Sequence, residues 1–550
     1  MDTIDYDFDW LVIGSGFGGS VSALRLAEKG YRVGVFERGR RFADQDKAES
    51  AWQLRKFLWA PTLGLRGAMR MKVFRHVFVP SQSGVGGGST VYGGVLYRAR
   101  QEFFTNPQWQ ALGDWQARLG PHYATAERML GATPVPFDST NQQLAREMAR
   151  HFGKPDGFAR SPTGVFFGAP GQTVKDPYFG GEGPDRTGCT RCGACMVGCR
   201  VGAVNSLTKN YLWFAEKRGV QVMPEHEVVD VRPIGAADGR DGYLVTTQRP
   251  GAWFGRNRRT FAARGVVFAA GTLGTNELLA NCKLNGSLPR VSGRLGELVR
   301  TNSESVLNVR LPADIKTWQD VTASSSVHVD QHTHIEFLTY GRNADAMSLM
   351  YTVLVGEGNR WTRPAMWLAA IARHPIQWLK TVWPVGWSRH MVTLLVMQTL
   401  DNAIVLRPRK RWLRRGYSLA TAQDQGKPNP SYIEVANQAA QWLAKRTGGI
   451  AQSNVLEALA DIPTSAHVLG GAVIGADAAS GVIDQNLRVF GYQNMLVCDG
   501  AAMPANPGVN PALTITALAE YAMAQLSPRE LNAQFSALPA AGIRSVPGTT

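Results

Sequence analysis

The order of apolar and polar positions at the start of the chain predicts a strand, a turn, a helix and a second strand. The expected elements are a strand over 9–13, a turn with Gly14, Gly16 and Gly19, a helix over 21–29, and a strand over 32–36 that ends at Glu37. This order is typical of the βαβ unit that binds dinucleotides. The turn alone would be a weak signal, but here it lies in register with both strands and with the acidic residue.

Each special position of this unit has a chemical reason. Gly14 permits a tight turn, Gly16 lets the backbone approach a pyrophosphate, and Gly19 lets the helix pack on the strand. Glu37 lies where a carboxylate accepts hydrogen bonds from ribose hydroxyls, which favours an adenosine without a 2′-phosphate. This unit alone leaves NAD and FAD as alternatives.

A second glycine-rich loop over 85–94 favours a flavin. It contains Gly86, Gly87, Gly88 and Ser89. NAD does not need a second loop of this kind so early in the chain, whereas a flavin requires close backbone approach around its ring and phosphates. The alternative is an ordinary glycine-rich surface loop.

Two loops near the C-terminus carry candidate catalytic residues. His467 lies before Gly470 and Gly471, and Asn510 lies in a loop marked by prolines and a glycine. Imidazole is suited to moving a proton near neutral pH, and an asparagine amide can donate and accept without titrating. Beside a flavin, this pair would suffice to oxidise an alcohol. The alternatives are a packed or surface histidine, and an asparagine that caps the helix expected from Pro511 onward.

Composition and charge narrow the class of protein. The 550 residues are 44% apolar and 19% charged, with a net charge of +16, as expected for a large globular protein with more than one domain or one enlarged domain. There is no basic or apolar leader at the start and no run of 18 uncharged apolar residues. We therefore expect a cytoplasmic protein without a membrane-spanning helix.

The basic residues gather with tryptophans in two segments, 51–79 and 361–390, and neither contains an acidic residue. Tryptophan with Arg or Lys on an apolar run is the composition of a helix that lies in a bilayer interface. We expect peripheral contact with the inner face of a membrane, and no nucleic-acid partner, since no nucleic-acid motif accompanies the segments. The alternative is a pair of amphipathic helices docked on the protein itself.

Four of the six cysteines lie within eleven residues. Cys189, Cys192, Cys195 and Cys199 have the spacing of a bacterial ferredoxin segment, although Arg200 stands where a proline is usual. The interpretations are an iron–sulfur cluster, a zinc knuckle, or cysteines that hold no metal. A cluster would make the protein a dehydrogenase that passes electrons to a protein or quinone, or an electron-transfer flavoprotein centred on the cysteines.

The motifs together resemble the glucose–methanol–choline flavoprotein oxidoreductases, and within them the cholesterol oxidase branch. The matching blocks are the N-terminal unit and residues 85–94, 268–274, 467–471, 496–500 and 507–520. The resemblance implies FAD as cofactor, with contacts that include Gly271, Asp499 and Gly500. Some relatives attach the flavin to a histidine of the second glycine loop. Residues 84–94 contain no histidine, so the FAD is expected to be non-covalent.

The resemblance also implies a reaction. A hydride passes from the carbinol carbon of a sterol-like secondary alcohol to the flavin, His467 holds or accepts the hydroxyl proton, and Asn510 positions the hydroxyl. Relatives of this branch use a carboxylate to move a double bond from Δ5 to Δ4 afterwards, and Glu336, in the apolar run 333–338, is the candidate here. The alternatives are a Glu336 that faces solvent, and a dehydrogenase of other lipophilic alcohols.

The implied fold is α/β, with an α+β substrate part. It comprises a discontinuous Rossmann-like FAD-binding domain and an inserted sheet-and-helix substrate domain. We expect the FAD domain over 1–110, 188–310 and 456–526, a covering insertion over 111–187, the substrate domain over 311–455, and a disordered tail over 527–550.

Overall fold

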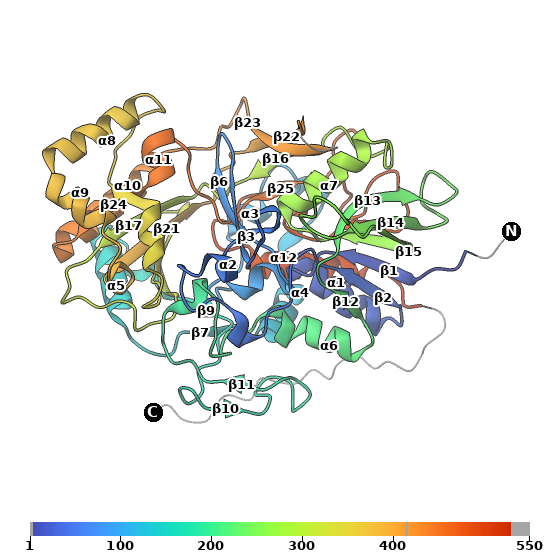
Figure 1. Ribbon diagram of the computed structural model, residues 1–550, viewed down its shortest axis with the longest axis horizontal. Helices are drawn as coiled ribbons and strands as arrows, with labels where there is room; N and C mark the ends of the chain where they lie inside the picture. The colour runs from blue at the N-terminus through green and yellow to red at the C-terminus, as the bar shows by residue number, and fades with distance from the viewer. Residues whose placement is uncertain (1–3, 413–415, 530–550) are drawn as a thin grey trace.

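The computed structural model describes residues 4–412 and 416–529, and most of the tail expected over 527–550 lies outside these described residues. Two large sheets lie at opposite ends of the molecule (Figure 1). The fold is mixed α/β, which confirms the predicted class. The first sheet holds the predicted N-terminal unit, and the second holds the strand that carries Glu336.

The first sheet follows the order β12-β2-β1-β15-β14-β13, with β26 paired to β15. Its strands are β1 (Phe8–Ile13), β2 (Val33–Phe36), β12 (Gln221–Met223), β13 (Glu227–Pro233), β14 (Tyr243–Gln248), β15 (Arg259–Phe268) and β26 (Met495–Val497). Every strand pair among β12, β2, β1, β15 and β26 is parallel. Strand β14 pairs antiparallel with both of its neighbours, β15 and β13. The carboxyl ends of the parallel strands therefore meet at one edge, where such sheets bind ligands.

The helix after β1 begins earlier than the sequence pattern predicts. Helix α1 spans Phe17–Glu28, so Gly19 is already helical. A Cβ at Gly19 would lie 2.0 Å from the carbonyl oxygen of Gly14, so only glycine allows this approach of helix to strand. The predicted role of Gly19 in close packing is thus visible in the structure. Helix α1 packs on α12 (Ala512–Ala524), which in turn packs on α4 (Trp115–Leu130).

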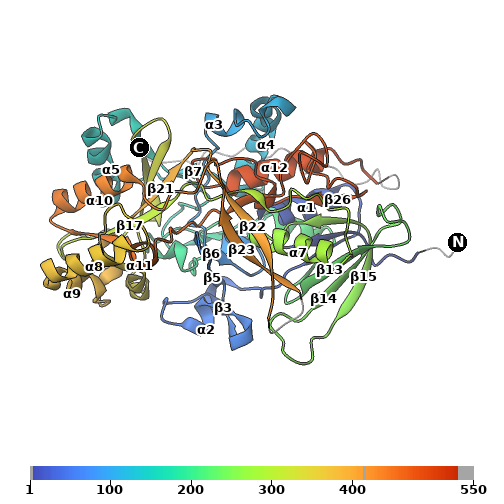
Figure 2. The same cartoon turned by 90° about the horizontal axis from the view of Figure 1, so that it is seen from above.

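The second sheet is antiparallel, in the order β20-β24-β17-β21-β19-β18-β8. Its strands are β8 (Phe158–Arg160), β17 (Ser305–Arg310), β18 (Ala323–His328), β19 (Thr333–Leu338), β20 (Tyr351–Val353), β21 (Met391–Gln398) and β24 (Ile450–Asn454). Helices α5 (Thr140–His151) and α10 (Glu434–Thr447) lie at the same end of the molecule in Figures 1 and 2 and share a core with this sheet.

Strand β19 is buried along its whole length, and its two faces have different partners. Ile335 and Phe337 join the core that includes Leu443 of helix α10. Side chains alternate along a strand, so His334, Glu336 and Leu338 point to the opposite face, toward the interior of the molecule. Glu336 is 0% exposed, which rules out the alternative that it faces solvent.

A smaller sheet joins the two ends, in the order β23-β22-β16-β25. Its strands are β16 (Glu297–Arg300), β22 (Ile404–Lys410), β23 (Tyr417–Gln423) and β25 (Leu469–Gly471). Strand β16 leads through residues 301–304 directly into β17 of the second sheet. This short connection therefore links the smaller sheet directly to the second sheet.

The other helices and strands are short or peripheral. They are α2 (Leu54–Phe57), α3 (Gln101–Phe104), α6 (Tyr211–Lys217), α7 (Thr272–Leu284), α8 (Thr362–Arg373), α9 (Pro375–Val382), α11 (Val455–Ala460), β3 (Trp59–Ala60), β4 (Leu65–Arg66), β5 (Met69–Val73), β6 (Phe78–Gln82), β7 (Thr133–Pro134), β9 (Pro162–Thr163), β10 (Thr173–Val174) and β11 (Arg186–Thr187). Within the described residues, none of the helices is long and apolar enough to cross a bilayer.

Candidate active site

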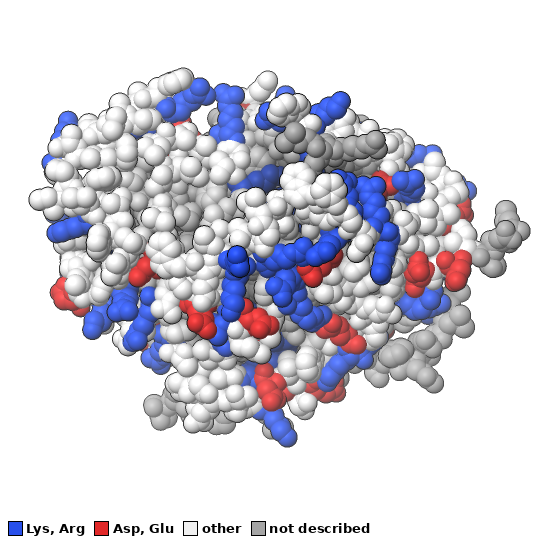
Figure 3. Space-filling model, in the orientation of Figure 1, with Lys and Arg blue, Asp and Glu red and all other residues white. Residues whose placement is uncertain are grey.

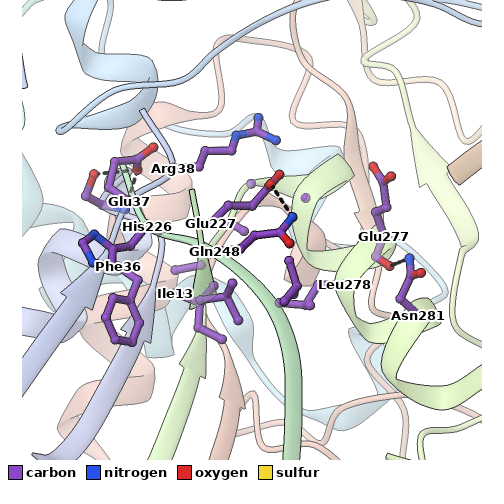
Figure 4. Close-up of a pocket in the computed structure, with 18 of the residues that line it drawn as sticks. Ile13, Phe36, Glu37, Arg38, His226, Glu227, Gln248, Glu277, Leu278 and Asn281 are labelled. Carbon is purple, nitrogen blue, oxygen red and sulfur yellow. Dashed lines mark hydrogen bonds between the residues drawn. The ribbon is translucent and has the colours of Figure 1, made fainter. Parts of the chain in front are cut away.

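A cavity of about 680 Å³ opens at the carboxyl ends of the parallel strands. Eight of the predicted cofactor residues line it: Gly14, Gly16, Glu37, Gly87, Gly88, Gly271, Asp499 and Gly500. Figure 4 shows Glu37 on one wall and Gln248, hydrogen-bonded to Glu227, on another. The cavity therefore extends from the end of β2 to the loop after β26. Residues of both predicted glycine loops line it.

The two glycine loops approach each other closely at this cavity. Gly14 has a φ of 102°, and a Cβ there would lie 2.2 Å from the carbonyl oxygen of Ala269. A Cβ at Gly87 would lie 2.6 Å from the Cα of Gly16. Gly16 precedes α1 and makes no side-chain cap, so the first N–H groups of the helix are open to an anion. Glycine backbone therefore forms part of this surface, which permits the close approach of a pyrophosphate.

Glu37 and Ser89 hold the walls of the cavity in place. The Glu37 carboxylate accepts hydrogen bonds from the Gly39 N–H at 2.8 Å and from the Ser15 hydroxyl at 2.8 Å. The Ser89 hydroxyl donates to the carbonyl oxygen of Gly86 at 2.7 Å. Both Gly86 and Ser89 were predicted to contact the cofactor, but neither lines the cavity. They lie behind Gly87 and support the loop that does.

Asp499 joins two loops that the sequence places far apart. Its carboxylate accepts hydrogen bonds from the Gly271 N–H at 2.8 Å, the Thr275 hydroxyl at 2.5 Å and the Ala501 N–H at 2.8 Å. Burial raises the pKa of Asp499 to about 6, although these donors oppose the shift. The carboxylate thus fixes the turn after β15 against the loop after β26, and both turns face the cavity.

The described structure fits an FAD molecule on these grounds: a side-chain-free phosphate surface, an acidic residue at the end of β2, and a cavity that continues past the second glycine loop. FAD bound there would supply the two-electron acceptor for a substrate alcohol.

His467 has an acidic partner that sequence reasoning missed. Its Nδ1 lies in a short hydrogen bond with Oε1 of Glu304, whose side chain is fully buried. A carboxylate can only accept, so Nδ1 carries the hydrogen and Nε2 keeps its lone pair. Burial disfavours the charged imidazole, but the charge and hydrogen bond of Glu304 outweigh it and raise the pKa of His467. His467 is therefore oriented as a base of increased proton affinity.

The segment that carries Glu304 also fixes the loop of Asn510. The Asn302 amide donates to the carbonyl oxygen of Val509 at 3.0 Å and accepts from the Gly508 N–H at 2.9 Å. Asn302 has a φ of 60°, in the left-handed region that asparagine tolerates better than most residues. The connection between β16 and β17 is thus the element that brings His467 and Asn510 together.

Asn510 and Glu336 meet in the interior. The Asn510 Nδ2 donates to Oε2 of Glu336 at 3.4 Å, and Asn510 is 7% exposed. Helix α12 has Pro511 as its N-cap without a side-chain cap bond, so the alternative that Asn510 caps this helix is wrong. Among the contacts of the described residues, the buried Asn510 Oδ1 has no hydrogen-bond partner. An open acceptor beside a buried carboxyl is suited to receive a ligand hydroxyl.

Glu336 is poised to exchange a proton near neutral pH. Burial raises the pKa of Glu336 to about 7, while the positive charge of His467 and the hydrogen bond from Asn510 act in the opposite direction. Glu336 and His467 interact electrostatically, and with Asn510 hydrogen-bonded to Glu336 they form a buried acid–base site. The three predicted catalytic residues thus lie together, and Glu304 completes the set.

The predicted metal site is not formed. Within residues 4–412 and 416–529, no group of three or more His, Cys, Asp or Glu side chains is placed to hold a metal ion. Cys189, Cys192, Cys195 and Cys199 are free thiols. Burial raises the pKa of Cys189 to about 12 and the pKa of Cys195 further. Cys195 and Cys199 instead pack in a small apolar core with Val165 and Val204.

The fold and the site together define an FAD-dependent oxidoreductase of alcohols. Comparison with known proteins agrees with this class. The family model for FAD dependent oxidoreductases matches residues 9–329, and that for GMC oxidoreductases, C-terminal part, matches residues 409–519. The chain belongs to the GMC oxidoreductase family.

Its relatives cover nearly the whole chain. A cholesterol oxidase of Mycobacterium tuberculosis is 46% identical over 530 residues, spanning 94% of this chain and 90% of the relative. A cholesterol oxidase of Acinetobacter baumannii is 43% identical, over 96% and 95% of the two chains. The crystal structure of a pyridoxine 4-oxidase from Mesorbium loti has a TM-score of 0.59 at 14% identity, covering 94% of this chain and 98% of that one, which supports the fold alone.

Proposed function

We propose that the enzyme oxidises a secondary hydroxyl of a sterol-like lipid to a ketone and then moves a ring double bond from Δ5 to Δ4. The observation that carries this proposal is the buried Glu336, which lies within hydrogen-bonding distance of Asn510 and close to His467. Oxidation alone needs a base and an orienting group, so a second buried acid suggests a second proton transfer. The names of the relatives favour a sterol as substrate.

In the first step one proton passes from the substrate hydroxyl to a side chain of the enzyme. The hydroxyl of the substrate donates its one hydrogen to His467 Nε2, and Asn510 orients the hydroxyl oxygen through the second N–H of its Nδ2, the first being donated to Glu336. The residues that line the cavity would hold FAD, which would supply the acceptor for the carbinol hydride; loss of this hydride and of the hydroxyl proton would convert the alcohol to a ketone. Glu304 stabilises the imidazolium that results, because its charge lies against Nδ1.

In the second step the proton moves within the substrate. Glu336 as a carboxylate takes a proton from the carbon between the ketone and the double bond and returns it to the far end of the shifted bond, so no net proton is gained or lost. A pKa of about 7 makes both forms of Glu336 accessible. Leu338, Leu395 and Met397 form an apolar cluster on the interior side of the strands that flank Glu336, which suits a sterol ring.

The oxidation is tested with the flavin-loaded enzyme and cholesterol. Anaerobic mixing should bleach the flavin absorbance, and admission of oxygen should restore it and yield hydrogen peroxide with a conjugated enone as product. A cholesterol whose hydroxyl is methylated is the matched control and should leave the flavin oxidised. Bleaching by a long-chain primary alcohol but not by cholesterol would contradict the proposal and support the dehydrogenase of other lipophilic alcohols.

We further propose that helices α8 and α9 bind the anionic inner face of a membrane. Figure 1 shows both helices at the margin of the molecule, and the surface there in Figure 3 is mostly uncharged. The exposed large apolar residues of this surface are Trp361 (75%), Leu368 (60%), Ile376 (69%), Leu379 (57%), Trp383 (62%) and Val385 (68%). Arg373 and Lys380 are exposed among them, and residues 361–390 contain no acid. This combination favours an anionic lipid interface.

One buried ion pair holds this surface in position. Arg363 at the start of α8 is 0% exposed and contacts Glu457 at 3.4 Å and Asp461 at 3.1 Å. The ion pair therefore fixes α8 against α11. The apolar residues on the outer face of α8 stay exposed. An exposed apolar face that is rigidly held is suited to interfacial binding.

Sedimentation with vesicles tests the membrane contact. Lys380→Gln should weaken binding to anionic vesicles about fivefold, since each basic residue near such a surface contributes about 1 kcal/mol. Trp383→Ser should weaken it further. Trp412→Ser is the matched control, because Trp412 is 95% exposed but follows β22 and lies outside α8 and α9. Equal binding by the Trp383 variant and the unmodified enzyme would contradict the proposal.

A further inference from the structure

A row of polar side chains runs from the protein surface to Glu336, and the oxidation step does not use it. Arg100 NH1 lies 2.6 Å from Nδ1 of His328, the His328 Nε2 lies 3.3 Å from Nδ1 of His334, and the His334 Nε2 lies 3.3 Å from Oε1 of Glu336. His328 and His334 are directly paired across β18 and β19, so the sheet register sets their contact. We call these three residues, Arg100, His328 and His334, the histidine relay.

The chemistry of Arg100 determines the direction of every hydrogen bond in the relay. A guanidinium can only donate, so the Nδ1 of His328 must accept. A neutral His328 then carries its hydrogen on Nε2 and donates to Nδ1 of His334. His334 in turn carries its hydrogen on Nε2 and donates to Oε1 of Glu336. The terminal donor thus fixes the tautomer of both rings, and the last N–H points at the carboxyl group.

Both rings are neutral in this environment. Burial, with Arg100 adding to it, lowers the pKa of His334 to about 3. Burial, the adjacent His334 and Arg100 lower the pKa of His328 to about 3, against the opposing charges of Asp330 and Glu102. A neutral ring has one donor and one acceptor, which is the condition under which a donor-only neighbour selects a single tautomer.

We propose that Arg100, His328 and His334 are positioning residues that lock a one-way hydrogen-bond relay and thereby stabilise the charged form of Glu336. Asn510 binds Oε2 and His334 binds Oε1, so each oxygen of the carboxylate has its own donor. The importance of the relay for catalysis rests on the isomerisation proposed above. The effect of the relay on the proton affinity of Glu336 is independent of the isomerisation.

The groups that surround Glu336 are consistent with this role. His467 lies on one side, with Glu304 behind it, and its positive charge also favours the carboxylate. Tyr97 lies on another side, where its hydroxyl donates to Ser161 or Ser326, and its ring meets the edge of His334 at 4.8 Å. His334 is therefore the donor to Oε1, while the neighbours fix the plane of its ring.

Arg100 connects the relay to the loop of Asn510. Its backbone N–H donates to the carbonyl oxygen of Pro507 at 3.2 Å, and its side chain contacts Gln331 and lies 3.7 Å from Glu102. The Arg100 side chain is 18% exposed, so this end of the relay reaches solvent while His334 is 0% exposed. A change at Arg100 would thus reach Glu336 without altering any buried residue.

Infrared titration of the flavin-loaded enzyme tests the proposal without any substrate. The carbonyl stretch of protonated Glu336 is assigned by its absence from Glu336→Gln protein. His334→Phe removes the donor to Oε1 and should raise the apparent pKa of Glu336 by about one unit, a tenfold change in the ratio of its two forms. His334→Gln restores an N–H donor and should recover most of the shift. Arg100→Met should raise the pKa by a smaller amount.

His332→Phe is the matched control, since His332 lies on the same hairpin but contacts Thr399 instead of the relay. It should leave the titration unchanged. An unchanged pKa in His334→Phe would overturn the proposal, as would a His334→Gln shift as large as that of His334→Phe. An unchanged pKa in Arg100→Met would overturn the locked direction, and this surface variant remains informative if His334→Phe does not fold. If the shifts occur but no enone is isomerised, the relay stands and the isomerase proposal fails.

Discussion

Replacing His467 by glutamine should slow flavin reduction by a saturating sterol by about 10²- to 10⁴-fold, the usual contribution of a positioned general base. Glutamine keeps the size of the side chain and can still bind Glu304, but it has no lone pair of suitable basicity to offer the substrate hydroxyl. Stopped-flow measurement of flavin bleaching without oxygen isolates this step. Sterol binding should change much less, because the apolar contacts of the ring system remain.

The pH dependence provides the control for this prediction. Oxidation requires neutral His467, and Glu304 raises the pKa of His467 above its usual value near 6.5, so activity should fall as the pH drops through that raised value. Glu304→Gln removes the charge but keeps the imidazole, and should move this fall in activity to lower pH. A fall that moves to higher pH, or a His467→Gln enzyme with the unmodified rate, would contradict the assignment of His467 as the base.

The cofactor side of the fold could be predicted from the sequence because its signals are local. The strand, turn, helix and acid follow one another within 30 residues, and backbone sterics at Gly14 and Gly19 leave few alternatives. The helix begins at Phe17, earlier than predicted, because Gly18, Gly19 and Ser20 lie in its first turn, where no apolar periodicity marks them. The second glycine loop was correctly associated with the cavity, though Gly86 and Ser89 act from behind it.

Glu304 could not be predicted in this way. It lies 163 positions before His467, at the start of a buried strand, and nothing nearby in the sequence marks it as a partner of a histidine. The only local signal is an acidic residue directly before a mostly buried strand. The same argument applies to the histidine relay, since Arg100 and His328 are 228 positions apart and meet only through the fold.

The cysteine spacing left an iron–sulfur cluster, a zinc knuckle and cysteines without metal as interpretations, and within the described residues no three of these side chains are placed to hold a metal ion. Close spacing in sequence does not fix where sulfur atoms point. Gly193 takes a left-handed conformation and its N–H donates to the carbonyl oxygen of Asp320 at 2.9 Å, so the backbone of this loop is held against the segment that precedes β18. Cys195 and Cys199 then turn into an apolar core. A ferredoxin-like site requires the loop to fold around a metal cluster, whereas Cys195 and Cys199 of this loop pack against apolar side chains of the protein.

Replacing Glu336 by glutamine should separate the two proposed steps. The amide cannot accept a proton from carbon, so isomerisation should fall by at least about 10²-fold while oxidation continues at within about tenfold of its normal rate. The unconjugated ketone should accumulate, visible as total ketone by chromatography without the ultraviolet absorbance of a conjugated enone. In the unmodified enzyme the isomerisation rate should fall as the pH drops below about 7, because protonation removes the carboxylate that acts as the base.

Glu457→Gln is the matched control for this substitution. Burial raises the pKa of Glu457 to about 7 as well, but its partner is Arg363 and it lies under α8, away from Asn510. A loss of its charge should lower the free energy of unfolding, because the buried Arg363 keeps only Asp461 as an acidic partner, and should not change the ratio of the two ketones. A Glu336→Gln enzyme that still releases conjugated product at the normal ratio would show that another group moves the double bond. The buried carboxyl on β19 would then serve only to orient Asn510 for the oxidation.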